Sequence, residues 1–240
     1  MPCPYEREST LSDASFQNLL LGRLPADDRS LLDLELVDVA LRHHLHAAGA
    51  PVDALYFPED GMASVVAQVG RSAIEVGLIG REGVTSPFVV TGDTLSPFDT
   101  FSQAAGTAYR APIDRVRQAL RQSQAFAGLL SRYYRAFEIQ VTATSVTNGQ
   151  ARLGERLARW LLMVSDRLGP HFHITHDLLA TMLAVRRSSV TLALQLLEGE
   201  GLIRSTRGHL VILDRKRLVE RADHSYGLAE AEYRRLMQTG

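Results

Sequence analysis

The chain has 240 residues, and its 26 Lys and Arg nearly balance its 27 Asp and Glu, giving a formal net charge of −1. This length suffices for one large domain or two modest domains with their own cores. No apolar run approaches the roughly 20 residues of a membrane span, and residues 1–10 lack the apolar stretch of a signal peptide. A single cysteine, Cys3, excludes a disulfide framework or a four-cysteine iron–sulfur cluster within one chain. We therefore expect a cytoplasmic globular protein without a cofactor.

Charge is distributed unevenly along the chain despite the near-neutral total. Residues 1–60 contain four Arg and eleven Asp or Glu, a balance of −7, whereas residues 151–222 contain twelve Arg or Lys and seven acids, a balance of +5. A protein that binds a polyanion needs only a local basic face, so this split is more informative than the total. It supports a nucleic-acid interface in the later part of the chain.

The first half of the sequence predicts a small helical start and then a β-structure. Residues 11–37 favour two short helices, the second beginning at Pro25. Short apolar runs then alternate with Gly, Pro and Asp, at residues 37–45, 54–57, 62–69, 72–79, 87–90 and 101–109. Regularly spaced short strands of this kind predict an antiparallel barrel or sandwich.

Three histidines, His43, His44 and His46, form a dense cluster of candidate metal ligands. On a strand His44 and His46 would share one face, which suits a metal site or a cupin-like enzyme centre in a barrel. A cupin centre also needs a carboxylate and a further histidine from later strands, and the next histidine, His171, lies beyond the barrel. We favour a polar strand and expect no metal, with a cupin-like metalloprotein as an alternative.

Residues 112–148 form the connector between the two halves. Apolar and aromatic side chains follow one another there at spacings close to three and four, which predicts one face of a long helix. The turn dipeptide Asn148-Gly149 predicts a hinge after it. A second amphipathic helix is expected at residues 153–168, closed by Gly169-Pro170 and carrying Trp160 in its core.

Residues 174–203 predict two short helices separated by a tight turn. Thr175 is a suitable N-cap for the first helix, and Val190, Leu194 and Leu197 give the second helix its inward face. The start of the second helix is cationic and rich in hydroxyl groups, as suits a recognition helix in the major groove. The candidate DNA-binding residues are Thr175, Arg186, Arg187, Ser188, Ser189 and Thr191.

A basic turn follows this pair of helices. Residues 204–209 separate the short apolar pair 202–203 from an expected strand at 210–213, and two strands joined by such a turn make a wing that reaches phosphates. Arg207 in this turn completes the candidate DNA-binding set. We find neither a nucleophile elbow nor a phosphate-cradling glycine loop, so we predict no catalytic residues and no enzyme.

These motifs together resemble the Crp/Fnr family of bacterial transcription regulators, over residues 15 to 220. The resemblance is carried by Ile174-Thr175, by Arg187-x-x-Val190, and by Leu196-Leu197-Glu198-x-x-Gly201-Leu202-Ile203 before the wing. It implies an α+β fold with an N-terminal antiparallel β-roll of the cyclic-nucleotide-binding (jelly-roll) type, a long dimerisation helix and a C-terminal winged helix-turn-helix. The implied domains are residues 11–112, 113–148 and 149–222, followed by a tail helix at 223–240.

The sequence departs from the resembled family in the DNA-binding domain. Ala184 stands at the turn position usually held by Gly, although glycine most easily takes a positive φ. The residues by which the cyclic-AMP-responsive relative reads its bases correspond here to Arg187, Ser188 and Leu192. The operator sequence therefore cannot be transferred from that relative.

A second departure lies in the expected ligand pocket. The resemblance places an effector pocket at Gly80, Arg81, Glu82, Asp99 and Thr100, where nucleotide-binding relatives use an Arg to neutralise the cyclic phosphate. Residues 88–108 contain no Arg or Lys, and Asp99 would repel a phosphate. We expect an unidentified small-molecule effector rather than a cyclic nucleotide, with a constitutive DNA binder whose sensor domain is vestigial as the alternative.

The resemblance also implies assembly. In the family the connector helix pairs with its copy, so that two recognition helices read half-sites about one DNA turn apart. The expected partners are double-stranded DNA, a second copy of the chain and RNA polymerase. The predicted dimer contacts are Phe126, Leu130, Tyr133, Tyr134, Phe137 and Val141.

Overall fold

The computed structural model describes residues 16–70 and 72–238 of the chain. Its first elements are a short 3-10 turn, η1 (Leu21–Arg23), and a short helix, α1 (Ala26–Ser30). The first predicted helix is therefore only a turn within the described part, and residues 11–15 of that prediction lie outside it. The apolar face of this first helix is expected at Phe16, Leu19, Leu20 and Leu24, and Leu19, Leu20 and Leu24 are indeed buried, together with Leu21.

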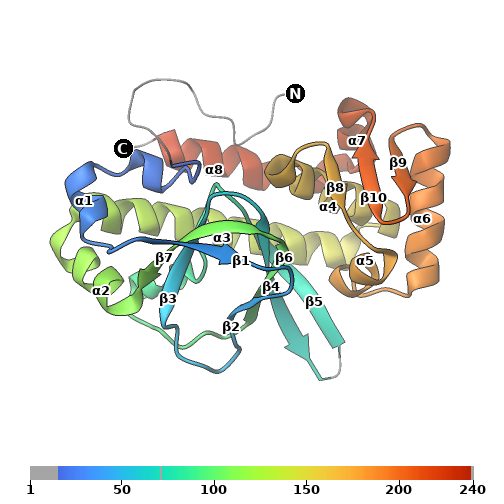
Figure 1. The fold of residues 1–240 in the computed structure, drawn as a ribbon. Helices are drawn as coiled ribbons and strands as arrows, with labels where there is room; N and C mark the ends of the chain where they lie inside the picture. The colour runs from blue at the N-terminus through green and yellow to red at the C-terminus, as the bar shows by residue number, and fades with distance from the viewer. Residues whose placement is uncertain (1–15, 71, 239–240) are drawn as a thin grey trace.

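Two antiparallel sheets make up the β-roll (Figure 1). One has the order β1-β7-β3, with bounds Glu35–Val39, Gly106–Pro112 and Ala54–Pro58. The other has the order β2-β6-β4-β5, with bounds His44–His46, Asp99–Ala104, Met62–Val69 and Ser72–Ile79. Their shared core contains Val39, Leu45, Ala63, Val65, Ile79 and Ala108. The predicted β-roll is confirmed.

Three of the predicted strands differ in the structure. The run 37–45 is split between β1 and β2, with Arg42 at φ 64 in the turn between them. The run 101–109 is likewise two strands, β6 and β7, separated at Ala105. The run 87–90 is not a strand but part of a 3-10 helix, η2 (Pro87–Thr91). Proline lacks an N–H donor and fixes φ at a value suited to the first turn of a helix, so Pro87 favours this outcome.

The connector consists of two helices, α2 (Ile113–Gln122) and α3 (Gln124–Gln150). Ser123 separates them in an extended conformation, and its Oγ accepts a hydrogen bond of 2.9 Å from the backbone N–H of Phe126. The hinge was predicted at Asn148-Gly149, but α3 continues through both residues. The break comes instead at Ala151 and Arg152, whose backbones are extended. A glycine near a helix end costs only about 1 kcal/mol, which the packing of so long a helix outweighs.

The C-terminal half is helical with a small sheet. It comprises α4 (Leu153–Leu168), β8 (His171–His173), α5 (His176–Met182), α6 (Arg187–Gly199), β9 (Ile203–Thr206), β10 (His209–Ile212), α7 (Arg215–Arg221), η3 (Asp223–Ser225) and α8 (Leu228–Gln238). The three strands form an antiparallel sheet in the order β8-β10-β9. The predicted helix 153–168 and the winged helix-turn-helix are confirmed.

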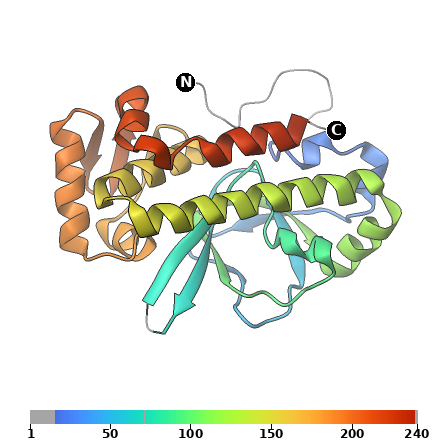
Figure 2. The same cartoon turned by 180° about the vertical axis from the view of Figure 1, so that it is seen from behind.

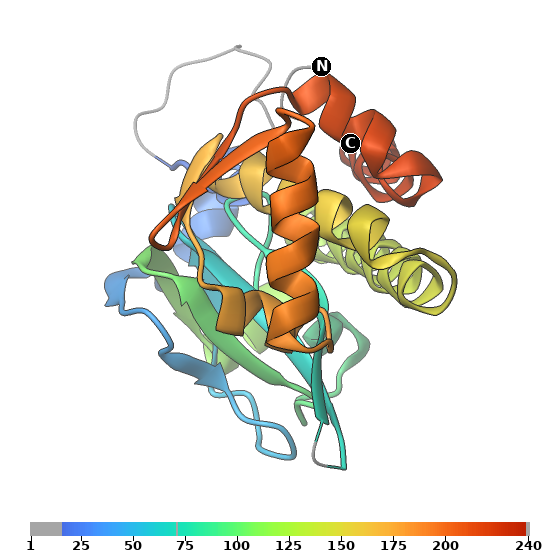
Figure 3. The same ribbon diagram turned by 90° about the vertical axis from the view of Figure 1, so that its right-hand side faces the viewer.

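The two halves of the chain are packed against each other. Met62, Val66 and Leu78 of the β-roll belong to the same buried cluster as Leu161 and the core of the C-terminal half. Helix α8 runs alongside α3, as the rear and end-on views show (Figures 2 and 3), and buries Tyr233 and Met237 in the core of the N-terminal half. Among the described residues, no helix is both long and apolar enough to cross a membrane.

Candidate nucleic-acid interface

Helices α5 and α6 form the predicted helix-turn-helix. The hydroxyl of Thr175 caps α5 by accepting a hydrogen bond of 3.2 Å from the backbone N–H of Leu178. Val190, Leu194 and Leu197 turn the inner face of α6 into the core. Ala184 adopts φ 51 in the turn, so the left-handed conformation usually given to glycine is taken by an alanine here.

The outward start of α6 carries the predicted cationic group. Arg186, Arg187 and Ser188 are exposed, and Ser189 is half-buried. In Figure 3 α6 runs along the near side of the molecule, with the small sheet beside it. The Arg187 Nε lies 3.1 Å from the Oδ1 of Asp177, and both side chains are exposed. Exposed ion pairs contribute at most about 1 kcal/mol, so this pair can be exchanged for contacts to DNA.

Two of the predicted DNA-binding residues have structural partners inside the motif. Besides capping α5, Thr175 lines a cleft against the β-roll. The Oγ1 of Thr191 lies 2.9 Å from the Nδ1 of His176 and donates to the carbonyl of Arg187, at 3.1 Å. The Thr191 hydroxyl therefore links α6 to α5, and the Thr175 hydroxyl caps α5.

The wing is a tight hairpin between β9 and β10. Its turn is Arg207-Gly208, with φ 46 and φ 86, and two residues of positive φ are the mark of a type I′ hairpin turn. The strands are longer, and the turn shorter, than residues 204–209 predict. The Glu198 Oε1 accepts a 2.6 Å hydrogen bond from the backbone N–H of Ser205, which ties the wing to the end of α6. Arg207 is exposed at the tip.

Arginines on α4 attach the DNA-binding domain to the connector. The Nε of Arg156 donates to the Oδ1 of Asn148 at 3.0 Å, and Arg156 also donates to the carbonyl of Leu183. The Nη1 of Arg159 donates to the Oγ1 of Thr144 at 3.0 Å, and Arg159 is buried. These cations fix the angle between α3 and α4 across the break at Ala151.

A buried carboxylate joins the β-roll to α4. The Glu75 Oε1 accepts a hydrogen bond of 2.7 Å from the indole Nε1 of Trp160, and its Oε2 accepts one of 2.6 Å from Ser64. Burial raises the pKa of Glu75 to about 7, against the opposing effects of these hydrogen bonds and of the Arg167 and Arg159 charges. Sequence reasoning missed this residue, although an acid inside an apolar strand was a visible signal.

The loop predicted to hold an effector instead forms a second junction. The Oε1 of Glu82 lies 2.6 Å from the Nη2 of Arg167 on α4, and both side chains are almost fully buried. A Cβ on Gly80 would lie 2.8 Å from the Cγ of Arg167, and one on Gly83 would overlap the hydroxyl of Tyr133. The loop therefore needs its glycines for close packing against α4 and α3. Gly80, Arg81 and Glu82 do not line the cavity between the β-roll and α3 that is described next.

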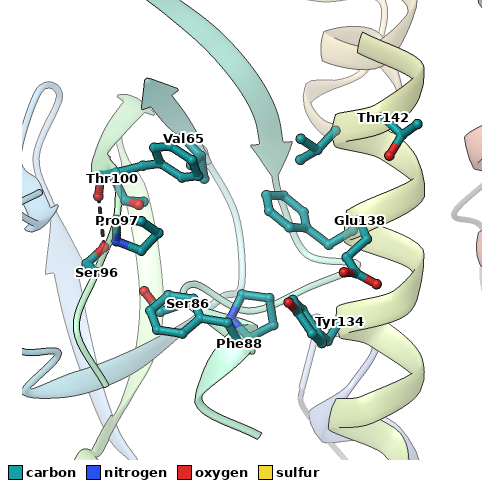
Figure 4. Close-up of a pocket in the computed structure, with 13 residues that line it drawn as sticks. Val65, Ser86, Phe88, Ser96, Pro97, Thr100, Tyr134, Glu138 and Thr142 are labelled. Carbon is teal, nitrogen blue, oxygen red and sulfur yellow. Dashed lines mark hydrogen bonds between the residues drawn. The ribbon is translucent and has the colours of Figure 1, made fainter. Parts of the chain in front are cut away.

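A cavity with a volume of about 280 Å³ lies between the β-roll and α3 (Figure 4). We call it the sensor cavity, after the role that we propose for it below. Thr100 lines it, as predicted. Asp99 does not, because its carboxylate is engaged by the N–H of Ala48 and the side chain of Gln68, each at 2.9 Å. The complete lining is Val65, Ser86, Pro87, Phe88, Ser96, Pro97, Phe98, Thr100, Tyr134, Phe137, Glu138, Val141 and Thr142.

The lining of this cavity is mainly apolar and includes a few side-chain hydroxyl and carboxylate oxygens. Its lining contains no Arg, Lys or His, and Glu138 is its one carboxylate. In Figure 4 Tyr134, Glu138 and Thr142 stand on α3 across from Ser96 and Thr100. A phosphate would find no charge partner in this lining and would meet Glu138. The wall suits an apolar ligand with hydroxyl, amide or cationic groups.

The predicted dimer contacts do not form a free face on α3. Phe126, Leu130 and Tyr133 are buried within the chain itself, and Tyr134, Phe137 and Val141 line the cavity. Phe126, Leu130 and Tyr133 are therefore covered within the chain and are not available as dimer contacts. Tyr134, Phe137 and Val141 are half-buried, and their role in a dimer stays a prediction. The exposed side of α3 carries Ser131, Arg135, Thr142, Ser145 and Val146.

The histidine cluster has local partners. The Nε2 of His46 lies 2.8 Å from the Oγ1 of Thr85, and burial lowers the pKa of His46 to about 4. The ring of His44 packs against Phe101. Within residues 16–70 and 72–238, no three His, Cys, Asp or Glu side chains gather as a metal site requires.

The chain joins a β-roll through a long helix to a helix-turn-helix with a wing, which is an architecture of DNA-binding proteins. Residues 155–221 match the family model of the Crp-like helix-turn-helix domain. No curated protein matches the sequence.

Solved structures share the fold over most of the chain. A regulator of the Crp/Fnr family from Eubacterium rectale has a TM-score of 0.67 at 18% identity, covering 86% of this chain and 98% of that one. FixK2 from Bradyrhizobium japonicum has a TM-score of 0.67 at 13% sequence identity, and the match covers 78% of this chain and 96% of FixK2. The c-di-GMP-responsive global regulator CLP from Xanthomonas campestris has a TM-score of 0.63 at 14% sequence identity, and the match covers 78% of this chain and 98% of CLP. Residues 155–221 are therefore a Crp-like helix-turn-helix domain, and the chain as a whole shares the fold of these Crp/Fnr-family structures.

Proposed function

We propose that the chain is a homodimeric, sequence-specific DNA-binding regulator whose affinity is set by a small molecule in the sensor cavity. The observation that carries DNA reading is the exposed start of α6, where Arg186, Arg187 and Ser188 face solvent, as Arg207 does at the wing tip. Side chains at this end of a recognition helix meet base edges, and a wing meets phosphates. RNA polymerase is the further partner that such a role implies.

The packing of the two halves supports a gating role. Thr175 and Asp177, at the start of α5, share a cleft with Leu41 and His44 of the β-roll. In helix-turn-helix complexes the first helix crosses the DNA backbone, so the β-roll stands beside a surface that DNA approaches. We take this docked arrangement as the form of lower DNA affinity. An effector that favours separation of the halves would raise affinity by the difference in its binding to the two forms.

The sensor cavity is connected to this junction through α3. Tyr134, Glu138 and Val141 of α3 line the cavity, and the same helix receives Arg159 and Arg156 of α4 near its end. A ligand that moves α3 would therefore also shift the position of α4. The lining favours an apolar ligand with hydroxyl, amide or cationic groups over a cyclic nucleotide. A constitutive binder with the same cavity would show no such coupling.

Dimer formation is the remaining part of the proposal. A twofold axis would place two α6 helices about 34 Å apart, to read a palindromic site. Because Phe126, Leu130 and Tyr133 are buried within the chain, the contact would use the half-buried Tyr134, Phe137 and Val141, the exposed side of α3 or another surface. Sedimentation of the chain, alone and with DNA, tests the stoichiometry.

Selection of bound fragments from a genomic DNA library tests the function. We expect a palindromic motif, and Arg187→Ala should reduce affinity for it by about 5- to 150-fold, corresponding to the loss of a base contact. Lys216→Ala, which removes an exposed cation from α7, is the matched control and should leave the motif preference intact. No enriched motif from the chain with or without effectors, or equal losses for both variants, would refute the assignment.

Gating is tested separately on the same operator. Compounds that raise the melting temperature of the chain are assayed for their effect on operator affinity, in the native chain and in Val141→Phe, which narrows the cavity. Coupling predicts that active compounds change operator affinity in the native chain and lose this effect in the variant. Compounds that bind this cavity without changing affinity would establish a constitutive DNA binder instead.

A further inference from the structure

The recognition helix α6 has an apolar outward face beyond its cationic start. Leu192 is 60% exposed and Leu196 is 54% exposed. Residues four apart lie on the same side of a helix, so Ser188, Leu192 and Leu196 follow one another on one face. A single exposed leucine is common on protein surfaces. Leu192 differs from such an isolated leucine because it lies one helical turn after Ser188, on the face of α6 that we propose reads DNA.

The surroundings of Leu192 indicate which molecule covers it. Arg186 and Arg187 stand one turn before it and are exposed, so the leucine continues a cationic face suited to a polyanion. The major groove presents hydrogen-bonding groups at every base pair, and the C5-methyl group of thymine is its characteristic apolar feature. A leucine offers no hydrogen bond, so it gains affinity in the groove only against such a methyl group.

We infer that Leu192 reads a thymine methyl group in the half-site and so determines specificity at that base pair. This rests on the proposed function and names the chemistry of one position that α6 recognises. Thymine is favoured there because its methyl group is buried against the side chain. Cytosine is disfavoured because its amino group would lose water without finding an acceptor.

Position along the helix separates Leu192 from Leu196. Contacts to base edges are made from the N-terminal part of a recognition helix, and Leu192 is the sixth residue of α6 whereas Leu196 is the tenth. Leu196 therefore lies about 6 Å further along the axis, where a helix that enters the groove by its N-terminus has begun to leave it. The two leucines match in side chain, helix and exposure, so each serves as a control for the other.

Replacement of thymine by uracil in the selected operator tests the inference, because it removes only the methyl group. Uracil is introduced at each thymine of the half-site in turn, and affinity is measured for the native chain, Leu192→Ala and Leu196→Ala. Burial of one methyl group is worth roughly fourfold in affinity. At one position the native chain and Leu196→Ala should both lose about fourfold, whereas Leu192→Ala should bind thymine and uracil operators equally.

The outcomes separate the inference from the proposed function. If a palindromic operator is selected but uracil has the same effect in all three proteins, or no effect in the native chain, the inference is overturned and the function stands. If no specific operator exists, both fall. A change in the oligomeric state of Leu192→Ala without DNA would show that Leu192 contacts protein, and would also overturn the inference.

Discussion

Replacing the buried carboxyl of Glu75 by an amide should remove a pH dependence from the junction between the β-roll and α4. Glu75→Gln retains an oxygen to accept from the Nε1 of Trp160 and an amide N–H to donate to Ser64, so the hydrogen-bonded shape of the site is kept. The variant differs from the native chain mainly in having no charge to bury.

The magnitude follows from the raised pKa of Glu75. Burial raises this pKa from 4.5 to about 7 in the folded chain, so between these values the folded state holds a proton that the unfolded state has released. The contribution of Glu75 to stability is therefore complete below pH 4.5 and is lost as the pH rises through about 7. The difference between the two pKa values corresponds to about 3 kcal/mol.

Urea unfolding between pH 5 and pH 8.5 measures the effect. Trp160 is the single tryptophan of the chain, so its fluorescence reports on the junction directly. Glu75→Gln should match the native chain near pH 5 and exceed it by about 3 kcal/mol at pH 8 and above. Asp166, whose pKa burial raises to about 6, and His46, whose pKa burial lowers to about 4, titrate in both proteins and cancel in the difference.

A matched substitution at an exposed glutamate serves as the control. Glu220→Gln makes the same chemical change at an exposed position and should not alter the pH dependence. If the stabilities of Glu75→Gln and the native chain stay parallel from pH 5 to pH 8.5, burial does not hold the Glu75 carboxyl neutral. If docking lowers DNA affinity as proposed, Glu75→Gln should also bind the operator more weakly than the native chain at pH 8.

Three further predictions concern the junction, the turn and the wing. Arg167→Met leaves the buried Glu82 carboxylate without its cation and should lower the free energy of unfolding by about 3–5 kcal/mol; full stability in urea would show that water reaches the site. Ala184→Gly relieves the left-handed backbone at φ 51 and should raise that free energy by up to about 1 kcal/mol; a lower melting temperature would contradict it. Arg207→Ala should weaken binding to all DNA sequences alike and reduce the salt slope by about one. A sequence-dependent loss would place Arg207 against a base.

The junction differs in character from the DNA-binding surface. It is built from buried ionisable groups whose partners come from the other half of the chain: Glu82 pairs with the charge of Arg167, and Glu75 accepts a hydrogen bond from the indole of Trp160. Such contacts are costly when one partner is lost but gain little over apolar packing when both are present. The gating that we propose requires a junction of this kind, which a change in charge or position can open.

Local sequence determined the DNA-binding domain. The N-cap Thr175, the inward spacing of Val190, Leu194 and Leu197, and the helix end at Gly169 each act within a few residues. Hydrogen bonds of caps and turns, and the period of a helix, depend on neighbours along the chain. For this reason the helix-turn-helix, its wing and the helix before it could be predicted from the sequence.

Only the tertiary structure decided what covers each apolar face and each buried charge. The stripe on α3 has the spacing of an interface, but Phe126, Leu130 and Tyr133 are buried by other elements of the same chain, which periodicity cannot reveal. Glu82 and Arg167, like Glu75 and Trp160, lie 85 residues apart, and no local pattern links them. Their pairing follows from how two separately patterned halves pack, because a buried polar or charged group is costly unless the fold places a hydrogen-bonding or oppositely charged partner beside it.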